Sequence, residues 1–305
     1  MPQILTILLT TVLPIVLIAG LGVLLDRSKT IDTGTLSTVI IYFGSPSLAF
    51  YSIATSSISG GEFGELVLFS LLSVLTITLI AWLVTIGAGM NRLTSSAFVL
   101  SAALVNGLNY GVPLNEFAFG QAAVARAILI GTMYALYAFS MGVFLASWGK
   151  ASIWGAFKNV LIVPLPYAAF LGLAVNLTQT ELPPLLLRIT QILGGLAIPL
   201  MLLMLGIQIS RASLHGQWRL MVGASAIRLV GGAGVGFLLA LLLGLGGVTR
   251  QVAIVQAAMP TAVAAGVLAT EFNSDAKLVS SIIMVSTLLS LITLPVIIMF
   301  VTNFS

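Results

Sequence analysis

Cysteine is absent from this chain, and charged side chains are scarce. Without cysteine there are no disulfides, thiolate nucleophiles or cysteine metal sites to consider. Charged residues make up 7% of the 305 residues, whereas a soluble domain has about 25%. This composition excludes an ordinary soluble domain. The chain also lacks a basic run interleaved with aromatic residues, so we expect no nucleic-acid partner.

Apolar residues are correspondingly abundant. They make up 59% of the chain, and the mean hydropathy is +1.17. A membrane-spanning helix needs about 20 mostly apolar residues, so we predict an all-α polytopic membrane protein embedded in the lipid bilayer. The first run lacks a basic start and an evident cleavage site, so we expect a retained helix. Ten spans fit the sequence: 4–25, 34–55, 63–88, 95–119, 123–147, 160–178, 185–208, 220–245, 251–269 and 278–303.

Basic residues predict the orientation of these spans. If both termini lie outside, the inner loops hold more basic residues than the outer loops, as the positive-inside rule requires. The inner residues are Arg27, Lys29, Arg92, Lys150, Lys158, Arg211, Arg219 and Lys277, and the outer ones are Arg126, Arg188 and Arg250. We therefore predict a multi-pass protein of the inner (plasma) membrane with both termini outside.

Proline and glycine recur in the same order in the two halves of the chain. The matched positions are Pro14 with Pro166, Gly20 with Gly172, Pro46 with Pro199, and residues 101–106 with 256–261. Five spans per half is an odd number, so the second half must enter the membrane from the opposite side. We predict one transporter domain, 1–305, built from inverted repeats 1–150 and 151–305. An unrelated ten-helix bundle is the alternative.

Two of the predicted spans carry polar or helix-breaking residues deep inside them. These are Asn106-Gly-Leu-Asn-Tyr-Gly-Val-Pro113 and Met259-Pro260-Thr261. An unpaired backbone group in a bilayer costs several kcal/mol, so such breaks survive only beside protein or a water-filled cavity. We expect half-helices to begin near Gly111-Val112-Pro113 and near Pro260-Thr261. Their N-terminal ends carry partial positive charge and suit an anion.

The predicted substrate-binding residues are Asn106, Asn109, Gly111, Pro113, Gln256, Pro260 and Thr261. The amides of Asn106 and Asn109 can donate to a carboxylate, although capping of freed backbone groups would also explain them. For Pro260 a simple packing kink is the alternative. Gln256 lies one turn before Pro260 and either reaches the same cavity or bonds to a neighbouring helix.

Few ionisable residues fall inside the spans. Glu116 is a candidate proton carrier, but solvation or pairing with Arg126 explains it equally well. Arg228 either snorkels to the membrane surface or contacts the substrate. Ser286, Ser290 and Thr293 share one helix face, which serves either a polar path or bonding between helices. We expect no cofactor or bound metal, and coupling to Na⁺ or H⁺ stays open.

Several motifs, in order along the whole chain, resemble the auxin efflux carrier family, which includes bacterial permeases and the plant PIN transporters. They are Asn106-Gly107 with Gly111-Val112-Pro113-Leu114, the run Gln256-Ala-Ala-Met-Pro260-Thr-Ala, the ending Ser286-Thr-Leu-Leu-Ser-Leu-Ile-Thr-Leu-Pro295, Gly44-Ser-Pro46-Ser-Leu and Ala197-Ile-Pro199-Leu-Met. The resemblance implies ten helices in two inverted repeats, similar to the bile-acid symporter fold. It also implies that broken helices four and nine cross, and that a mobile domain moves against helices one, two, six and seven.

The resemblance further implies transport of organic anions, such as auxin in plants and malonate or other small carboxylates in bacteria. It implies that Asn106 contacts the substrate carboxylate and that Pro260 and Thr261 form the second crossover. Val105 stands where the plant carriers have proline, and their long central hydrophilic loop is missing here. These differences favour a bacterial permease over an auxin carrier.

We therefore predict an elevator-type secondary transporter for a small carboxylate. The alternatives are a sodium-coupled organic-anion symporter of the bile-acid type and a channel. An enzyme is not expected, because the sequence has no nucleophile with a base, no paired carboxylates and no metal cluster at a plausible spacing. A homodimer is one assembly that the sequence leaves open.

Overall fold

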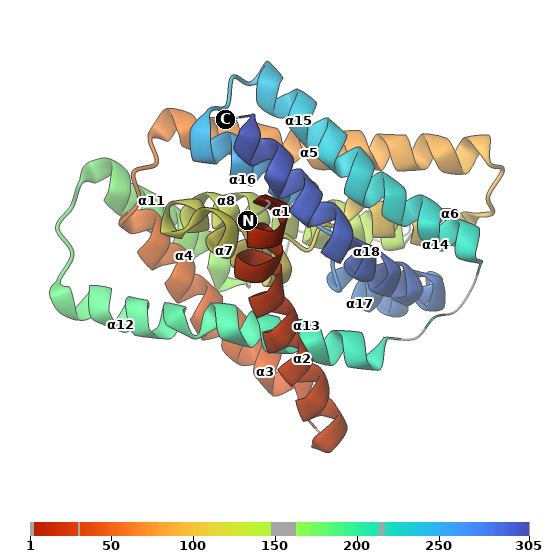
Figure 1. Ribbon diagram of the computed structural model, residues 1–305, viewed down its shortest axis with the longest axis horizontal. Helices are drawn as coiled ribbons and strands as arrows, with labels where there is room; N and C mark the ends of the chain where they lie inside the picture. Colours follow the sequence, from red (N-terminus) through yellow and green to blue (C-terminus); the bar gives the residue numbers. More distant parts are fainter. Residues whose placement is uncertain (1–2, 30, 148–162, 213, 215–216, 305) are drawn as a thin grey trace.

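The computed structural model describes residues 3–29, 31–147, 163–212, 214 and 217–304, and these are helical almost throughout (Figure 1). Among them, seven helices are long and apolar enough to cross a membrane, and the helix Pro164–Thr178 is apolar but shorter. The prediction of an all-α polytopic membrane protein is confirmed at this level. Lys150, Lys158 and the predicted repeat boundary at 150/151 lie outside the described residues.

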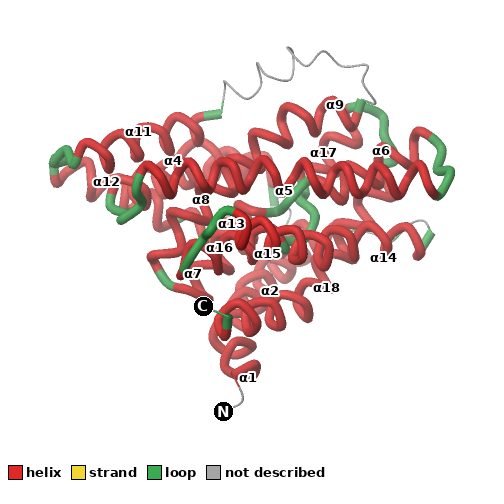
Figure 2. Tube along the Cα trace, turned by 90° about the horizontal axis from the view of Figure 1, so that it is seen from above, coloured by secondary structure: helices red, strands yellow, loops and turns green. Residues whose placement is uncertain are grey.

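The first half of the chain forms long helices, several of which contain a short π-helical turn (η). The elements are α1 (Gln3–Ile7), η1 (Leu8–Val12), α2 (Leu13–Ser28), α3 (Thr33–Val39), η2 (Ile40–Gly44), α4 (Ser45–Ala54), α5 (Gly60–Gly87), α6 (Arg92–Ala103), η3 (Gly107–Gly111), α7 (Val112–Phe119), α8 (Gln121–Tyr137), η4 (Ala138–Gly142) and α9 (Val143–Ala146). Short loops join them, as Figure 2 shows.

The second half repeats this style of construction. Its elements are α11 (Pro164–Thr178), α12 (Pro184–Gly195), α13 (Ala197–Arg211), α14 (Trp218–Ala226), η5 (Ile227–Gly231), α15 (Gly232–Leu242), α16 (Gly247–Ala257), α17 (Ala264–Glu271) and α18 (Ala276–Asn303). Near the two ends of the chain, Asn303 Nδ2 donates to Gln3 Oε1 at 3.0 Å. The described ends of the chain therefore lie side by side.

Polar side chains mark where several helices begin. Asp32, Ser59, Asn91 and Asp275 each accept a hydrogen bond from a backbone N–H in the first turn of the helix that follows. Such caps satisfy donors that have no partner within the helix. Hydrogen bonds from the Thr35 hydroxyl and from two backbone N–H groups lower the pKa of the Asp32 carboxyl. These caps place the helix ends at the short loops.

The helices form two groups. In the first, α2 packs across α13, and α4 packs against α11 and α12; we call α1–α4 and α11–α13 the flanking group. In the second, α5, α6 and α8 pack with α14, α15, α16 and α18; we call α5–α9 and α14–α18 the central group. Figure 1 shows α12 and α13 as one long segment that α2 crosses. The two helices that the sequence predicts to be broken, near residues 106–113 and 259–261, both belong to the central group.

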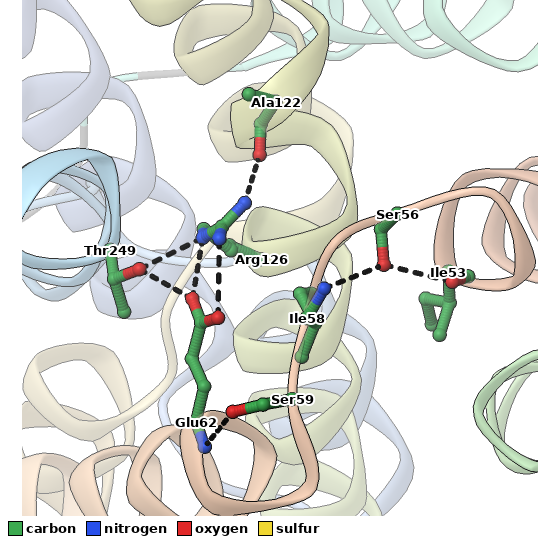
Figure 3. Close-up of polar contacts among 8 residues, drawn as sticks. All are labelled: Ile53, Ser56, Ile58, Ser59, Glu62, Ala122, Arg126 and Thr249. Atoms are coloured by element: carbon green, nitrogen blue, oxygen red, sulfur yellow. Dashed lines mark hydrogen bonds and ion pairs between the residues drawn. The ribbon is translucent and has the colours of Figure 1, made fainter. Parts of the chain in front are cut away.

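A buried ion pair ties one end of the central group together (Figure 3). Arg126 Nε on α8 lies 2.6 Å from Glu62 Oε1 on α5, and the same Nε donates to Thr249 Oγ1 on α16 at 2.9 Å. The Thr249 hydroxyl in turn donates to Glu62. Three helices that are distant in sequence therefore share one network at this end.

The alternative that Arg126 pairs with Glu116 is wrong. Arg126 is engaged by Glu62, while Glu116 accepts a hydrogen bond from Gln121. Glu116 lies near the end of α7, and Gln121 begins the next helix after Gly120, whose φ of 76° allows the sharp turn. The carboxyl that pairs with Arg126 thus comes from a helix two spans away.

Candidate functional site

The two predicted helix breaks are present, and they meet. Residues 104–106 separate α6 from η3, and residues 258–263 separate α16 from α17. Val105 and Thr261 form an isolated antiparallel bridge. Asn106 N donates to Pro260 O and Ala262 N donates to Leu104 O, each at 2.9 Å. Each break thereby satisfies polar backbone groups of the other, which a bilayer alone cannot do. We call this region the crossing.

The first half-helix does not begin where the sequence predicted. It begins at Gly107, whereas we expected a start near Gly111-Val112-Pro113. Gly111 N bonds back to Asn106 O at 3.0 Å, which closes the π-helical turn, and Pro113 follows inside a continuous helix. The wider turn accommodates the missing proline N–H, so Pro113 causes no break.

A cavity of about 220 Å³ lies beside the crossing. Residues 106, 108 and 109 of the first broken helix border it, and so do residues 262–264 of the second. The first N–H groups of a helix have no partner within it and carry its partial positive charge. The N-terminal ends of two half-helices therefore converge on one cavity, whose other walls come from η2, α4, α8, η4 and α11.

Asn106 borders this cavity and has a buried side-chain donor without a partner among the described residues. Its side chain is 5% exposed, borders the cavity, and its Nδ2 has no hydrogen-bond partner among the described residues. It also makes no capping bond to η3, so capping does not account for its position. A buried donor without a partner costs about 1–3 kcal/mol, which a bound acceptor would recover. Asn109 borders the same cavity.

Gln256 bonds the first broken helix to its neighbours. It is fully buried, and its Nε2 donates to Gly107 O at 3.1 Å and to Ala127 O at 3.0 Å. A Cβ at Gly111 would lie 2.4 Å from Gln256 Oε1, so glycine is needed there for close packing. Of the two alternatives for Gln256, bonding to neighbouring helices is the one observed.

Thr261, Ser286 and Ser290 form a second set of supports. Thr261 Oγ1 donates to Ser101 O at 2.8 Å, and Thr261 N donates to Ser286 Oγ at 3.2 Å. Ser290 Oγ donates to Thr287 O at 2.6 Å within α18. The predicted polar face of α18 thus turns toward the crossing, where Ser286 bonds to the second break. Among the predicted site residues, only Asn106 and Asn109 border the cavity.

Arg228 does not snorkel to the membrane surface. It is 1% exposed, and its Nη1 donates to Ala102 O at 2.9 Å while its Nη2 donates to Ala257 O. Those carbonyls lie at the ends of α6 and α16, immediately before the two breaks. The structure therefore brings Arg228 to the crossing but not to the cavity. Ser45 and Tyr134 also border the cavity. Ser45 belongs to the motif Gly44-Ser-Pro46, whereas no pattern in the sequence indicated Tyr134.

Comparisons with known proteins assign the family. Residues 150–298 match a family model described as a membrane transport protein. An uncharacterized transporter of Methanothermobacter thermautotrophicus is 31% identical over 299 residues, which cover 93% of this chain and 95% of that protein. The chain belongs to the auxin efflux carrier family. An uncharacterized transporter of Methanocaldococcus jannaschii is 25% identical over 268 residues, which cover 85% of this chain and 86% of that protein.

Membership of the auxin efflux carrier family makes this chain an integral membrane transport protein. The family that the motifs in the sequence indicated is thereby confirmed. Nothing in the relatives' names specifies a substrate. The ligand of this protein must therefore be inferred from the residues at the crossing.

A second opening lies near the crossing. A cleft of about 530 Å³ runs between α3 and α13 on one side and α17 and α18 on the other. Val263 borders both the cleft and the cavity, while Arg211 and Lys277 border the cleft alone. Arg211 also pairs with Asp26 at 2.7 Å. The cleft therefore lies between the flanking and central groups, beside residues predicted to face inward.

Proposed function

We propose that this protein is a secondary transporter that binds a small organic anion at the crossing and moves it across the membrane by alternating access. One observation carries the proposal: two half-helix N-termini border the same cavity as Asn106, whose buried Nδ2 has no partner among the described residues. Helix N-termini bind carboxylates through free N–H groups and the helix dipole. The helix N-termini and the Asn106 amide can bind an anion without a cationic side chain in contact with the ligand.

The size of the cavity favours a small substrate. Its volume of about 220 Å³ is below the roughly 300–1,000 Å³ of sites for drug-sized ligands. Most of its lining is apolar, with Asn106 and Asn109 as polar side chains from the broken helix. A small carboxylate, malonate-like or auxin-like, matches this combination of a few donors and an apolar wall.

The transport mechanism that we propose is of the elevator type, with two inverted five-helix repeats. The breaks fall in predicted helices four and nine, which are equivalent in the two halves, and they pair antiparallel through Val105 and Thr261. Both broken helices lie in the central group, and the cleft separates part of this group from α3 and α13. Sliding of the central group along the flanking group would carry the crossing with it. Coupling to Na⁺ or H⁺ remains a prediction.

Asn106→Ala tests the proposal in reconstituted vesicles. We expect saturable uptake of radiolabelled malonate by the unaltered protein and a loss of about tenfold or more in apparent affinity for the variant. A hydrogen bond to a charged group contributes about 1.5–3 kcal/mol, and 1.4 kcal/mol is a factor of ten. Asn303→Ala, at an exposed asparagine far from the crossing, is the matched control and should transport normally.

The same assay separates a carrier from a channel. Counter-transport by malonate loaded on the opposite side is expected of a carrier, because one site alternates between the two faces. Unsaturable flux with single-channel currents would indicate a channel. Unchanged uptake by Asn106→Ala would show that the substrate binds elsewhere. The assay should be repeated with an auxin as substrate to compare ring-containing and small acids.

A further inference from the structure

Arg228 is the largest fully buried side chain among the described residues. Its guanidinium donates to Ala102 O and Ala257 O, and a longer contact of 3.5 Å reaches Ala103 O. No carboxylate pairs with it within the described ranges. A charge at membrane depth without a counter-charge is strongly unfavourable, so its environment must offset it.

The ends of two helices provide that offset. Ala102 and Ala103 end α6, and Ala257 ends α16. The C-terminal end of each helix carries about half a negative charge on its unpaired carbonyls. Two such ends balance about one guanidinium. Neighbouring carbonyls have other donors, since Ser101 O accepts from Thr261 Oγ1 and Leu104 O accepts from Ala262 N.

Glycine makes room for this contact. A Cβ at Gly232 would lie 2.2 Å from Ala257 O and 2.5 Å from Arg228 Nη2. Gly236 likewise approaches Ala257, where a Cβ would lie 2.7 Å from the Ala257 Cβ. Gly232 and Gly236 of α15 therefore form the surface on which α16 and the guanidinium pack.

The charge balance of the crossing changes with Arg228. Without Arg228, the partial charges of the two helix C-termini, about −0.5 elementary charge each, cancel those of the two N-termini, about +0.5 each. With it, the C-termini are neutralised and the positive potential of the N-termini at the cavity remains. We propose that Arg228 is a positioning and specificity-determining residue, whose buried charge makes the crossing electropositive and so selects anionic ligands. The inference rests on the proposed function, because it concerns the same cavity.

Ligand charge distinguishes this role from a purely structural cap. We would measure dissociation constants of malonate, its monoamide and its diamide, which have nearly the same shape but different charge, for the unaltered protein and Arg228→Gln. The affinity of Arg228→Gln should fall about tenfold or more for each negative charge that the ligand carries. Its affinity for the neutral diamide should be unchanged. Arg188→Gln removes an exposed charge and should bind all three normally.

Arg228→Lys is the second variant. It keeps the charge but replaces the planar fork, so it cannot hold both helix ends in the same geometry. If the charge selects anions, this variant should retain most of the affinity for malonate relative to the diamide. An equal loss for all three ligands in both variants would show that Arg228 acts as a structural cap only, and would overturn the inference.

Iodide tests the potential itself, independently of substrate identity. Sodium iodide should raise the melting temperature of the purified unaltered protein and of Arg188→Gln more than that of Arg228→Gln. Equal shifts in all three proteins would overturn the inference. If the unaltered protein binds neither malonate nor its amides but shows the iodide shift, the proposed substrate class fails while the role of Arg228 stands.

Discussion

At the scale of single residues, buried polar side chains serve two different purposes. Gln256 and Thr261 donate to backbone carbonyls that face the two breaks, so they hold the crossing together. Asn106 instead keeps its Nδ2 unpaired beside the cavity. The sequence predicts all three as site residues, because each is polar at membrane depth. Only their partners in the folded protein distinguish the two side chains that support the crossing from Asn106, which we propose contacts the ligand.

Removing one partner of the Glu62–Arg126 pair should be strongly destabilising, because the side chains are only 17% and 11% exposed. Arg126→Gln would leave Glu62 buried without its partner, and we expect a loss of about 3 kcal/mol in the free energy of unfolding. Denaturation of Glu62→Gln, Arg126→Gln and the double variant in detergent forms a double-mutant cycle. Additive losses would contradict a direct interaction between the two side chains.

At the scale of elements, proline has a different meaning in this chain than its sequence suggests. Pro14, Pro46 and Pro113 each stand two residues after a π-helical turn, η1, η2 and η3. In each case the helix continues, because the wider turn accommodates the proline without leaving a clash or an unpaired carbonyl. The first break falls at residues 104–106, which contain no proline, and only the second break contains one, Pro260.

The contact between α2 and α13 depends on two glycines. A Cβ at Gly206 would lie 1.8 Å from Ala19 O, and one at Gly22 would lie 2.2 Å from Leu203 O. Gly206→Ala must therefore push the helices apart, and we expect a destabilisation of about 1–3 kcal/mol, as for other overpacked sites. A lower melting temperature of the purified protein would show it.

A glycine in open space is the control for that substitution. A Cβ at Gly234 meets nothing within 4 Å, and Gly234 lies inside helix α15. Gly234→Ala should leave the melting temperature unchanged or raise it, because alanine favours helix more than glycine does. Equal destabilisation by both substitutions would argue against close packing of α2 on α13.

At the scale of the whole molecule, the described conformation has its cleft on one side of the crossing. The cleft is bordered by Arg211 and Lys277, which the distribution of basic residues places on the inner face. At the other end, Glu62, Arg126 and Thr249 join three helices of the central group. With the predicted orientation, we expect this conformation to be open toward the inside.

Cysteine labelling tests this, because the chain has no cysteine of its own. Ser280→Cys places a thiol on the wall of the cleft. We expect a membrane-impermeant maleimide to label it in inside-out vesicles and not from the other face, and malonate to change the labelling rate. Thr178→Cys, at the exposed end of α11, is the control and should label only from the opposite face. The reverse pattern would contradict the orientation.

The sequence predicted the membrane class, the helical secondary structure and the two segments in which helices break. These features follow from apolar run length and from polar residues at membrane depth, which are local properties. The folded structure was needed to place the start of the first half-helix at Gly107, the burial of Arg228 and the pairing of Arg126 with Glu62. Each depends on which distant backbone or side-chain group satisfies a polar atom in a medium without water, and the pattern of one segment does not contain that information.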